Sequence, residues 1–188
     1  MLSMLLALAV QSPDDAIAAR LAAMTSLYDE LCLRTFPDDA ALDAEMAKRG
    51  ARQLTPAEVK VTLNDDPGRG WSIELAGATA LVILETPPYH ACSVRWPMPA
   101  ELGDLSQYRA LAKAYTAGKP GFAPMDPMDV DMGELHIAAI GEQRTLPNGG
   151  GESLLVIAQQ VRDPKRRANG ETGTMLRFVH QISSPGAH

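Results

Sequence analysis

The residues best suited to specific chemistry lie in a segment rich in methionine and aspartate. It contains Met125, Met128 and Met132, and His136 follows directly. Thioether and imidazole groups are ligands that suit a soft ion such as Cu(I). The aspartates could instead bind Ca²⁺, but their spacing departs from the usual calcium loop, which places acids at alternate positions before a glycine. A third interpretation is that the methionines fill gaps beneath a loop whose aspartates face water.

Arrangements typical of catalysis are few. Glu134 and His136 are two positions apart in a predicted strand, so they share one face and could act in acid–base chemistry or bind a metal. A pair of this kind is also typical of a polar outer face. His90 and Cys92 form a similar pair, but both are predicted to face the core. The chain has no G-x-S-x-G motif and no phosphate-binding loop. We therefore expect no cofactor and lean against an enzyme, with His90 or His136 as the residues that an enzyme would use.

The chain contains two cysteines, Cys32 and Cys92, whose spacing fits no metal or redox motif. In an oxidising compartment they would pair, and closing a loop of that length would stabilise the fold by roughly 4 kcal/mol. In a cytoplasmic protein they would instead be two buried free thiols, because a free cysteine packs like a small hydrophobic residue.

The first ten residues, MLSMLLALAV, are apolar, and Ala7-Leu8-Ala9 resembles the small-x-small end of a secretory signal. No basic residue precedes the apolar run, and the run is far shorter than the roughly 20 residues of a membrane span. No cysteine lies near Ala9, so this segment shows no site for a lipid anchor. We interpret 1–10 as a signal-like leader, 11–183 as one domain and 184–188 as a frayed tail. A periplasmic or secreted location follows, with the cytoplasm as the alternative.

Length and charge narrow the function further. A chain of 188 residues favours one domain with a sizeable core. Its net charge of −6 argues against a nucleic-acid partner, which would require a basic face. The one basic cluster, residues 165–167, is too short to change that expectation.

Helix start signals occur three times before the first strand. In each, a serine or threonine precedes a proline or acidic residues, a combination that satisfies free backbone N–H groups. Alternating or continuous apolar runs then predict six strands, with one helix between the third and the fourth. The expected helices span 12–33, 35–49, 55–63 and 104–117, and the expected strands span 71–75, 81–84, 90–96, 134–140, 153–161 and 174–182.

This order predicts an α+β fold with an antiparallel meander sheet of about six strands, three N-terminal helices and one inserted helix. The most apolar segment, residues 79–96, should form the spine of the sheet. The layout resembles that of profilin-like or PAS-like domains, in which helices cover one side of such a sheet. A resemblance of topology implies nothing about function.

Part of the chain also resembles a group of uncharacterised exported proteins or lipoproteins of proteobacteria. The resemblance spans roughly residues 25–96. It implies that Cys32 pairs with Cys92 and that the protein resides in the cell envelope, and it implies no activity. The residues that carry it are Tyr28, Cys32, Thr35, Pro37, Asp38, Gly50, Trp71, Cys92, Ser93 and Val94.

Together these observations predict an envelope protein that is stabilised by one disulfide and binds a protein or a small molecule. We expect the ligand in a cleft between helix 104–117 and the sheet, where Tyr108, Tyr115 and Phe122 are the nearby aromatic residues. The alternative is a periplasmic Cu(I)-binding protein that uses the methionine segment and His136.

Overall fold

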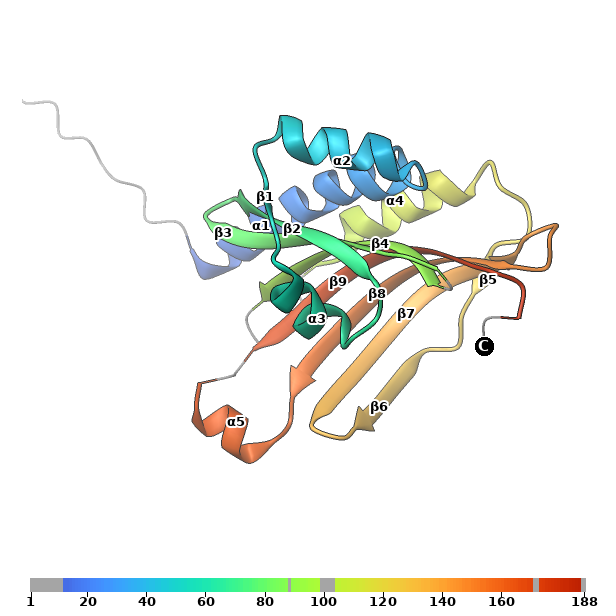
Figure 1. Ribbon diagram of the computed structural model, residues 1–188. Coiled ribbons are helices and arrows are strands. Elements are labelled where there is room, and N and C mark those ends of the chain that lie inside the picture. The colour runs from blue at the N-terminus through green and yellow to red at the C-terminus, as the bar shows by residue number, and fades with distance from the viewer. Residues whose placement is uncertain (1–11, 88, 99–103, 171–172, 187–188) are drawn as a thin grey trace, which may run out of the picture.

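The structure, a computed structural model, describes residues 12–87, 89–98, 104–170 and 173–186. These residues form an α+β fold with a nine-stranded antiparallel sheet (Figure 1). The helices are α1 (Pro13–Tyr28), the π-helical η1 (Asp29–Leu33), α2 (Asp39–Lys48), α3 (Pro56–Leu63), α4 (Ser106–Thr116) and α5 (Pro164–Ala168). The strands are β1 (Arg52–Gln53), β2 (Gly68–Leu75), β3 (Ala78–Glu85), β4 (Tyr89–Met98), β5 (Ala123–Pro124), β6 (Met128–Met132), β7 (Leu135–Thr145), β8 (Gly151–Val161) and β9 (Thr174–Ser183). The predicted leader lies outside the described residues.

Two of the three predicted helix starts are confirmed, at Ser12 and Thr55. The third is shifted: α2 is capped by Asp38, and the Thr35 hydroxyl donates to the Glu30 carbonyl instead. The Ser12 side chain accepts from the backbone of Asp15, whose carboxylate bonds back to Ser12. Thr55 and Glu58 form the same reciprocal box at the start of α3. Such boxes satisfy backbone N–H groups that have no partner within the helix.

The predicted number of strands is wrong. The six expected strands correspond to β2, β3, β4, β7, β8 and β9, and the sheet has three more. Two of these, β1 and β5, contain two residues each, too few for a periodic pattern. The third, β6, has five residues that are all exposed, so its sequence resembles a polar loop.

The sheet consists of two meanders that meet at one antiparallel pair. Its order is β1-β2-β3-β4-β9-β8-β7-β5, and β6 also pairs with β7. The two meanders join where β4 pairs with β9 along its whole length, from Tyr89 opposite Ser183 to Met98 opposite Thr174. This pairing fixes which side chains of the two halves are neighbours.

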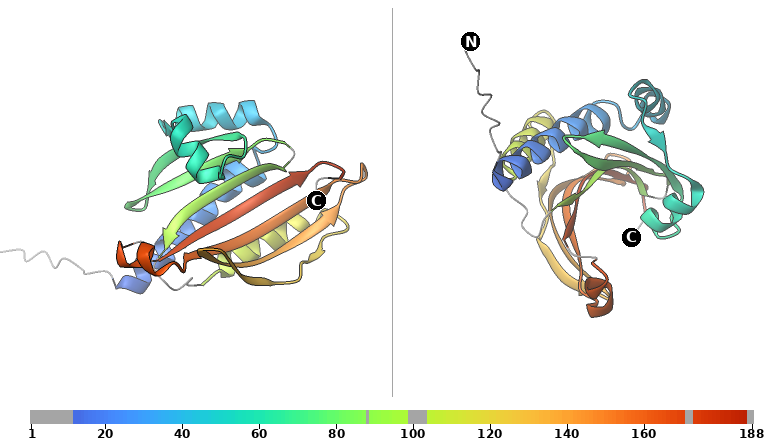
Figure 2. Two further views of the ribbon diagram at one scale, coloured as in Figure 1. Left: turned by 60° about the horizontal axis from the view of Figure 1, so that its bottom comes forward. Right: turned by 90° about the vertical axis from the view of Figure 1, so that its left-hand side faces the viewer.

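The sheet is strongly curved, and helices lie on both of its faces (Figure 2). The outer face is covered by α1, α2 and α4, and we call it the covered face. In contrast, α3 lies on the inner side, over β2 and β3. The expectation of three grouped N-terminal helices is therefore not met, because β1 separates α3 from the others and α3 packs on the opposite face.

The main core lies between the covered face and its helices. Tyr28 of α1 and Tyr108 of α4 both pack on Phe178 of β9, with ring centroids 5.8 Å and 4.4 Å away. All three residues are buried. The covered face therefore supplies the burial of apolar surface that stabilises the fold.

A disulfide joins the helical layer to the sheet, as predicted. Cys32 of η1 and Cys92 of β4 are bonded, with their Cα atoms 5.3 Å apart. Both residues are completely buried. Among the helices of the described residues, none is both long and apolar enough to cross a membrane.

We expect the disulfide to contribute a large share of stability. Replacing both cysteines, Cys32→Ala with Cys92→Ala, should lower the free energy of unfolding by about 4 kcal/mol, because the closed loop spans 60 residues. Urea unfolding of the double variant and of the native protein, each with and without reductant, measures this. Reductant should destabilise the native protein and leave the variant unchanged; equal midpoints for all four samples would contradict the prediction.

Candidate functional site

Over β9, β8, β7 and β6, no helix of the described residues covers the inner side of the sheet (Figure 2). Because strand side chains alternate, residues between those of the core point to this side. Leu154 and Val156 of β8 belong to the core, so their neighbours Leu155 and Ile157 face inward. We call this surface the open face. Its side chains on those four strands include the apolar Met175, Val179, Leu155, Ile157, Val161, Leu135, Ile137, Ala139, Met128, Val130 and Met132, and the polar Arg177, Gln159, Gln181, Ser153 and Gln143.

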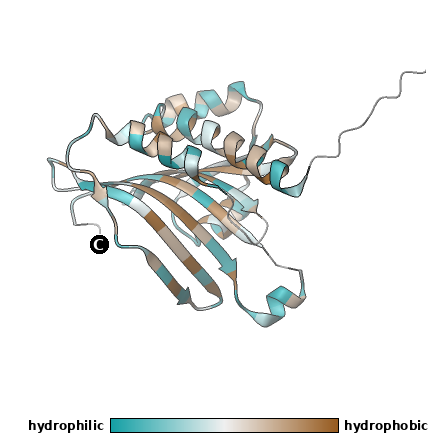
Figure 3. Ribbon diagram, turned by 180° about the vertical axis from the view of Figure 1, so that it is seen from behind, coloured by the Kyte–Doolittle hydropathy of each residue, from teal (hydrophilic) through white to brown (hydrophobic). Residues whose placement is uncertain are grey.

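Most of the open face is apolar. On β6, Met132, Met128 and Val130 have exposed fractions of 58%, 40% and 39%. They stand opposite Leu135, Ala139 and Ile137 of β7 in the register of the sheet. Figure 3 shows hydrophobic and hydrophilic residues alternating along these strands. An exposed apolar surface of this kind is typical of a binding site.

A cavity of about 320 Å³ lies where the open face meets α3. This volume is within the range of small-molecule sites. Six polar side chains line it among apolar residues: Arg95, Arg177, Gln159, Thr62, Thr174 and Arg166. Of these, Arg166 forms an ion pair with Glu134 at 3.2 Å. The apolar lining includes Val61, Leu81, Pro97, Leu135, Val161 and Met175.

Two arginines stand side by side in this cavity. Arg95 of β4 and Arg177 of β9 are direct partners across the junction of the two meanders. Arg95 is only 6% exposed, and it donates to the Ser93 hydroxyl (3.0 Å) and the Thr62 carbonyl (2.8 Å). Arg177 donates through Nη2 to the Gln159 side-chain oxygen. Its Nε is buried and has no hydrogen-bond partner within the described structure.

The positive charge of this pair is not balanced. Within the described ranges, neither arginine forms an ion pair with a carboxylate, and their bonds go to neutral oxygens. Burial lowers the pKa of Arg95 to about 9, and the neighbouring charge of Arg177 adds to the shift. Burial also lowers the pKa of Arg177. Like charges opposite each other in a sheet are destabilising, so this arrangement favours an incoming anion.

Glu85 is an acid on the same side that interacts electrostatically with both arginines, without forming an ion pair. Burial raises the pKa of Glu85, and the charge of Asp66 adds to that rise, while the two arginines act in the opposite direction. Glu85 therefore weakens the positive potential of the cavity but does not cancel it.

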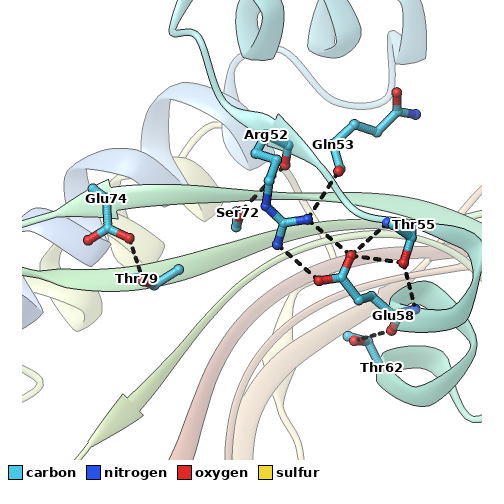
Figure 4. A network of polar contacts seen from close by, with 8 residues as sticks. All are labelled: Arg52, Gln53, Thr55, Glu58, Thr62, Ser72, Glu74 and Thr79. Atoms are coloured by element: carbon cyan, nitrogen blue, oxygen red, sulfur yellow. Dashed lines mark hydrogen bonds and ion pairs between the residues drawn. The ribbon is translucent and has the colours of Figure 1, made fainter.

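Surface hydrogen bonds connect the helix that bounds the cavity, α3, to the chain before it (Figure 4). Both Nη atoms of Arg52 donate to the Glu58 carboxylate, each at 3.0 Å. Glu58 also accepts from the backbone N–H of Thr55 at 2.7 Å. Hydrogen bonds from Arg52 and then from Thr55 lower the pKa of Glu58 to about 2. These bonds link the start of α3 to the residues before it, and the Thr62 carbonyl of the same helix accepts from Arg95.

Two glycines of β2 let α3 and its flanking chain approach the sheet. A Cβ at Gly68 would lie 2.5 Å from a methyl group of Leu63 in α3. One at Gly70 would lie 2.5 Å from a methyl group of Ile83 in β3 and 3.0 Å from a methyl group of Leu54, in the chain before α3. Real Cβ atoms do not approach as closely as 2.5 Å. The short distance between β2 and α3 thus depends on residues without a side chain.

The structure does not bring the four predicted metal ligands together. Met128 and Met132 point to the open face, whereas His136 points to the other face, where it contacts Asp131 at 2.8 Å. Met125 precedes the strand, and its backbone bonds to Gly141. Among the described residues, no group of three or more His, Cys, Asp or Glu side chains is arranged to hold a metal ion.

The three predicted aromatic residues of the cleft have different surroundings. Tyr108 is buried in the core and also lines a groove of about 360 Å³ between α4 and β7. Tyr115 and Phe122 pack on each other with ring centroids 6.5 Å apart, and neither lines that groove. A groove therefore exists on this side, but only one of the three residues contributes to it.

A second polar cluster lies within the covered face. Glu152 accepts from Tyr115 (2.7 Å) and from Nε of Arg144 (2.7 Å), and it contacts Nε2 of His180 at 2.9 Å. The other imidazole nitrogen lies 2.6 Å from the Cys32 carbonyl. Both ring nitrogens of His180 are therefore in hydrogen-bond contact with groups of the protein.

This cluster is saturated by its own members. Burial alone would raise the pKa of Glu152, but hydrogen bonds from its three partners outweigh it and set the pKa at about 2. Burial raises the pKa of Tyr115, as does its hydrogen bond to Glu152. Every charged group here has an opposite charge in contact, which is typical of a structural network. We therefore place the candidate site at the arginine pair.

The comparisons with known proteins supply no relative: no family model, no curated protein and no solved structure matches the chain. The site is therefore defined by its geometry. Neither arginine was identified from the sequence, because no local pattern indicates that Arg95 and Arg177 are neighbours. That contact depends on the pairing of strands about eighty positions apart.

Loss of the Glu152 carboxylate should destabilise the protein in a pH-dependent way. Its folded pKa is below the ordinary value of 4.5, so its contribution is complete above about pH 4.5 and disappears as the pH falls towards 2. Glu152→Gln should lower the free energy of unfolding at pH 7 by about 3–5 kcal/mol, because the partly buried Arg144 and the buried His180 lose the carboxylate that they share. It should also flatten the stability profile between pH 2 and 4.5.

Chemical unfolding at several pH values measures this, with the exposed Asp126→Asn as the control. A Glu152→Gln variant with the stability and the acid profile of the control would contradict the assignment of a structural network.

Removing one charge of the arginine pair should stabilise the protein. Arg177→Met keeps an apolar stem of similar length, removes the buried Nε without a partner and ends the repulsion of Arg95. We expect the free energy of unfolding to rise by about 1 kcal/mol. Urea unfolding measures this against Arg109→Met, an exposed arginine on α4 for which we expect almost no change. A loss of stability in Arg177→Met would instead assign the pair a structural role.

Proposed function

We propose that this protein binds a small apolar or amphipathic molecule on the open face of its sheet. The observation that supports this best is the composition of that face. The four strands β9 to β6 present a largely apolar surface that no described helix covers, next to a cavity of about 320 Å³. Its apolar side chains lower their free energy when a ligand removes them from water.

The second part of the proposal concerns the compartment. A buried disulfide between Cys32 and Cys92 supports a location where disulfides persist, such as the periplasm or the extracellular space. The apolar leader predicted from the sequence, residues 1–10, also supports a location outside the cytoplasm. We therefore propose an envelope or secreted binding protein, in agreement with the resemblance to exported proteins.

Binding is favoured over catalysis by the state of the ionisable groups. The polar groups of the covered face, Glu152, His180 and Tyr115, are hydrogen-bonded to one another, and Glu152 and His180 are buried. The arginines of the open face can donate hydrogen bonds but are poor proton acceptors at neutral pH. A catalytic site needs a nucleophile or a base within reach of its substrate.

A charge in the open face should weaken binding of a neutral apolar probe. We expect the fluorescence of N-phenyl-1-naphthylamine to increase when it binds the native protein. Ile137→Asp should weaken this binding at least fivefold, because it places a charge among the apolar side chains of the open face. Fluorescence titration gives the dissociation constants.

The matched control is Ile140→Asp, since Ile140 lies on the same strand but on its other face, in the groove beside α4. Loss of binding in Ile140→Asp alone would move the site to that groove, and equal binding by all three proteins would remove the proposal.

A further inference from the structure

The arginine pair restricts the kind of molecule that the open face accepts. We propose that the ligand is an amphipathic monoanion with a single aliphatic chain, a long-chain carboxylate, whose head group contacts Arg95 and Arg177. This inference rests on the proposed function and adds a ligand class to it. It is carried by the position of these two arginines, which form no ion pair with a described carboxylate, beside the apolar side chains of the cavity.

The head-group position follows from the donors that are free. Nε of Arg95 and one of its terminal nitrogens are engaged with Ser93 and Thr62. In Arg177, Nη2 is engaged with Gln159, while the buried Nε has no partner. An oxygen placed beside Arg177 Nε would satisfy that group and lie next to both guanidinium charges.

The charge of the head group follows from the same geometry. Only one buried N–H of the pair lacks a partner, and Glu85 opposes further negative charge in the cavity. The whole protein is also acidic, with a net charge of −6. These features favour a carboxylate with one negative charge over a phosphate with two.

The shape of the ligand follows from the apolar side chains around the pair. Met175, Val161 and Leu135 line the same cavity as the arginines. The surface continues to Ile137 and Val130, which are partners in the pairing of β7 with β6. From β9 to β6 it spans three strand spacings, roughly 14 Å, which accommodates an extended aliphatic chain but few contacts to a compact anion.

Calorimetric titration with dodecanoate below its micelle concentration tests the inference, with dodecanol as the neutral analogue and acetate as the chainless one. The native protein should bind dodecanoate at least tenfold more tightly than dodecanol and should not bind acetate measurably. Arg177→Gln should remove the preference for dodecanoate, whereas Arg177→Lys should retain part of it because the charge remains. Arg109→Met, in the groove on the other face, should bind like the native protein.

Each other outcome has a separate meaning. If dodecanol binds as tightly as dodecanoate, the open face binds apolar chains but the anion inference is wrong. If dodecyl phosphate binds more tightly than dodecanoate, the monoanion assignment is wrong. If only vesicles of phosphatidylglycerol bind, the ligand is a membrane surface and the inference is also wrong.

If neither dodecanoate nor N-phenyl-1-naphthylamine binds, the proposed function fails as well. Circular dichroism of Arg177→Gln and Arg177→Lys establishes that a lost preference does not reflect unfolding.

Discussion

The pairing of β4 with β9 is the constraint on which the rest of the structure depends. It joins two meanders that are far apart in the sequence, and its register decides what each face of the sheet contains. On the covered face it places Cys92 opposite His180, and three residues further along, on the open face, it places Arg95 opposite Arg177. A register slip of one residue would move both sets to the wrong face. One strand pair therefore positions both the disulfide and the candidate site.

Charged groups have an opposite charge in contact on the covered face but only neutral partners at the arginine pair of the open face. We therefore assign the first set to stability and the second to function. Removing an ion from water costs several kcal/mol unless an opposite charge compensates it. On the covered face, the Glu152 carboxylate compensates His180 and Arg144, and the apolar core surrounds them. On the open face, Arg95 and Arg177 have only neutral partners. An arrangement that does not stabilise the empty protein is expected where a ligand supplies the missing charge.

Local patterns predicted the elements that carry strong signals. The helix caps at Ser12 and Thr55, the six longer strands and the faces of residues 90–96 all follow from periodicity and capping chemistry. The disulfide was expected from the resemblance and from the possible leader. The strand β6 could not be predicted, because its residues are exposed on both sides and alternate aspartate with methionine. The arginine pair could not be predicted either, since it depends on the order of strands in the sheet, which no local pattern encodes.

The position of a bound chain tests the central claim most directly. A crystal structure with 12-bromododecanoate would locate both ends of the ligand, because bromine scatters anomalously. Our account predicts the carboxylate within hydrogen-bond distance of Arg177 Nε and the bromine over the apolar side chains of β7 and β6. A molecule bound in the groove between α4 and β7, or one on the open face with its carboxylate directed away from the arginines, would contradict the account.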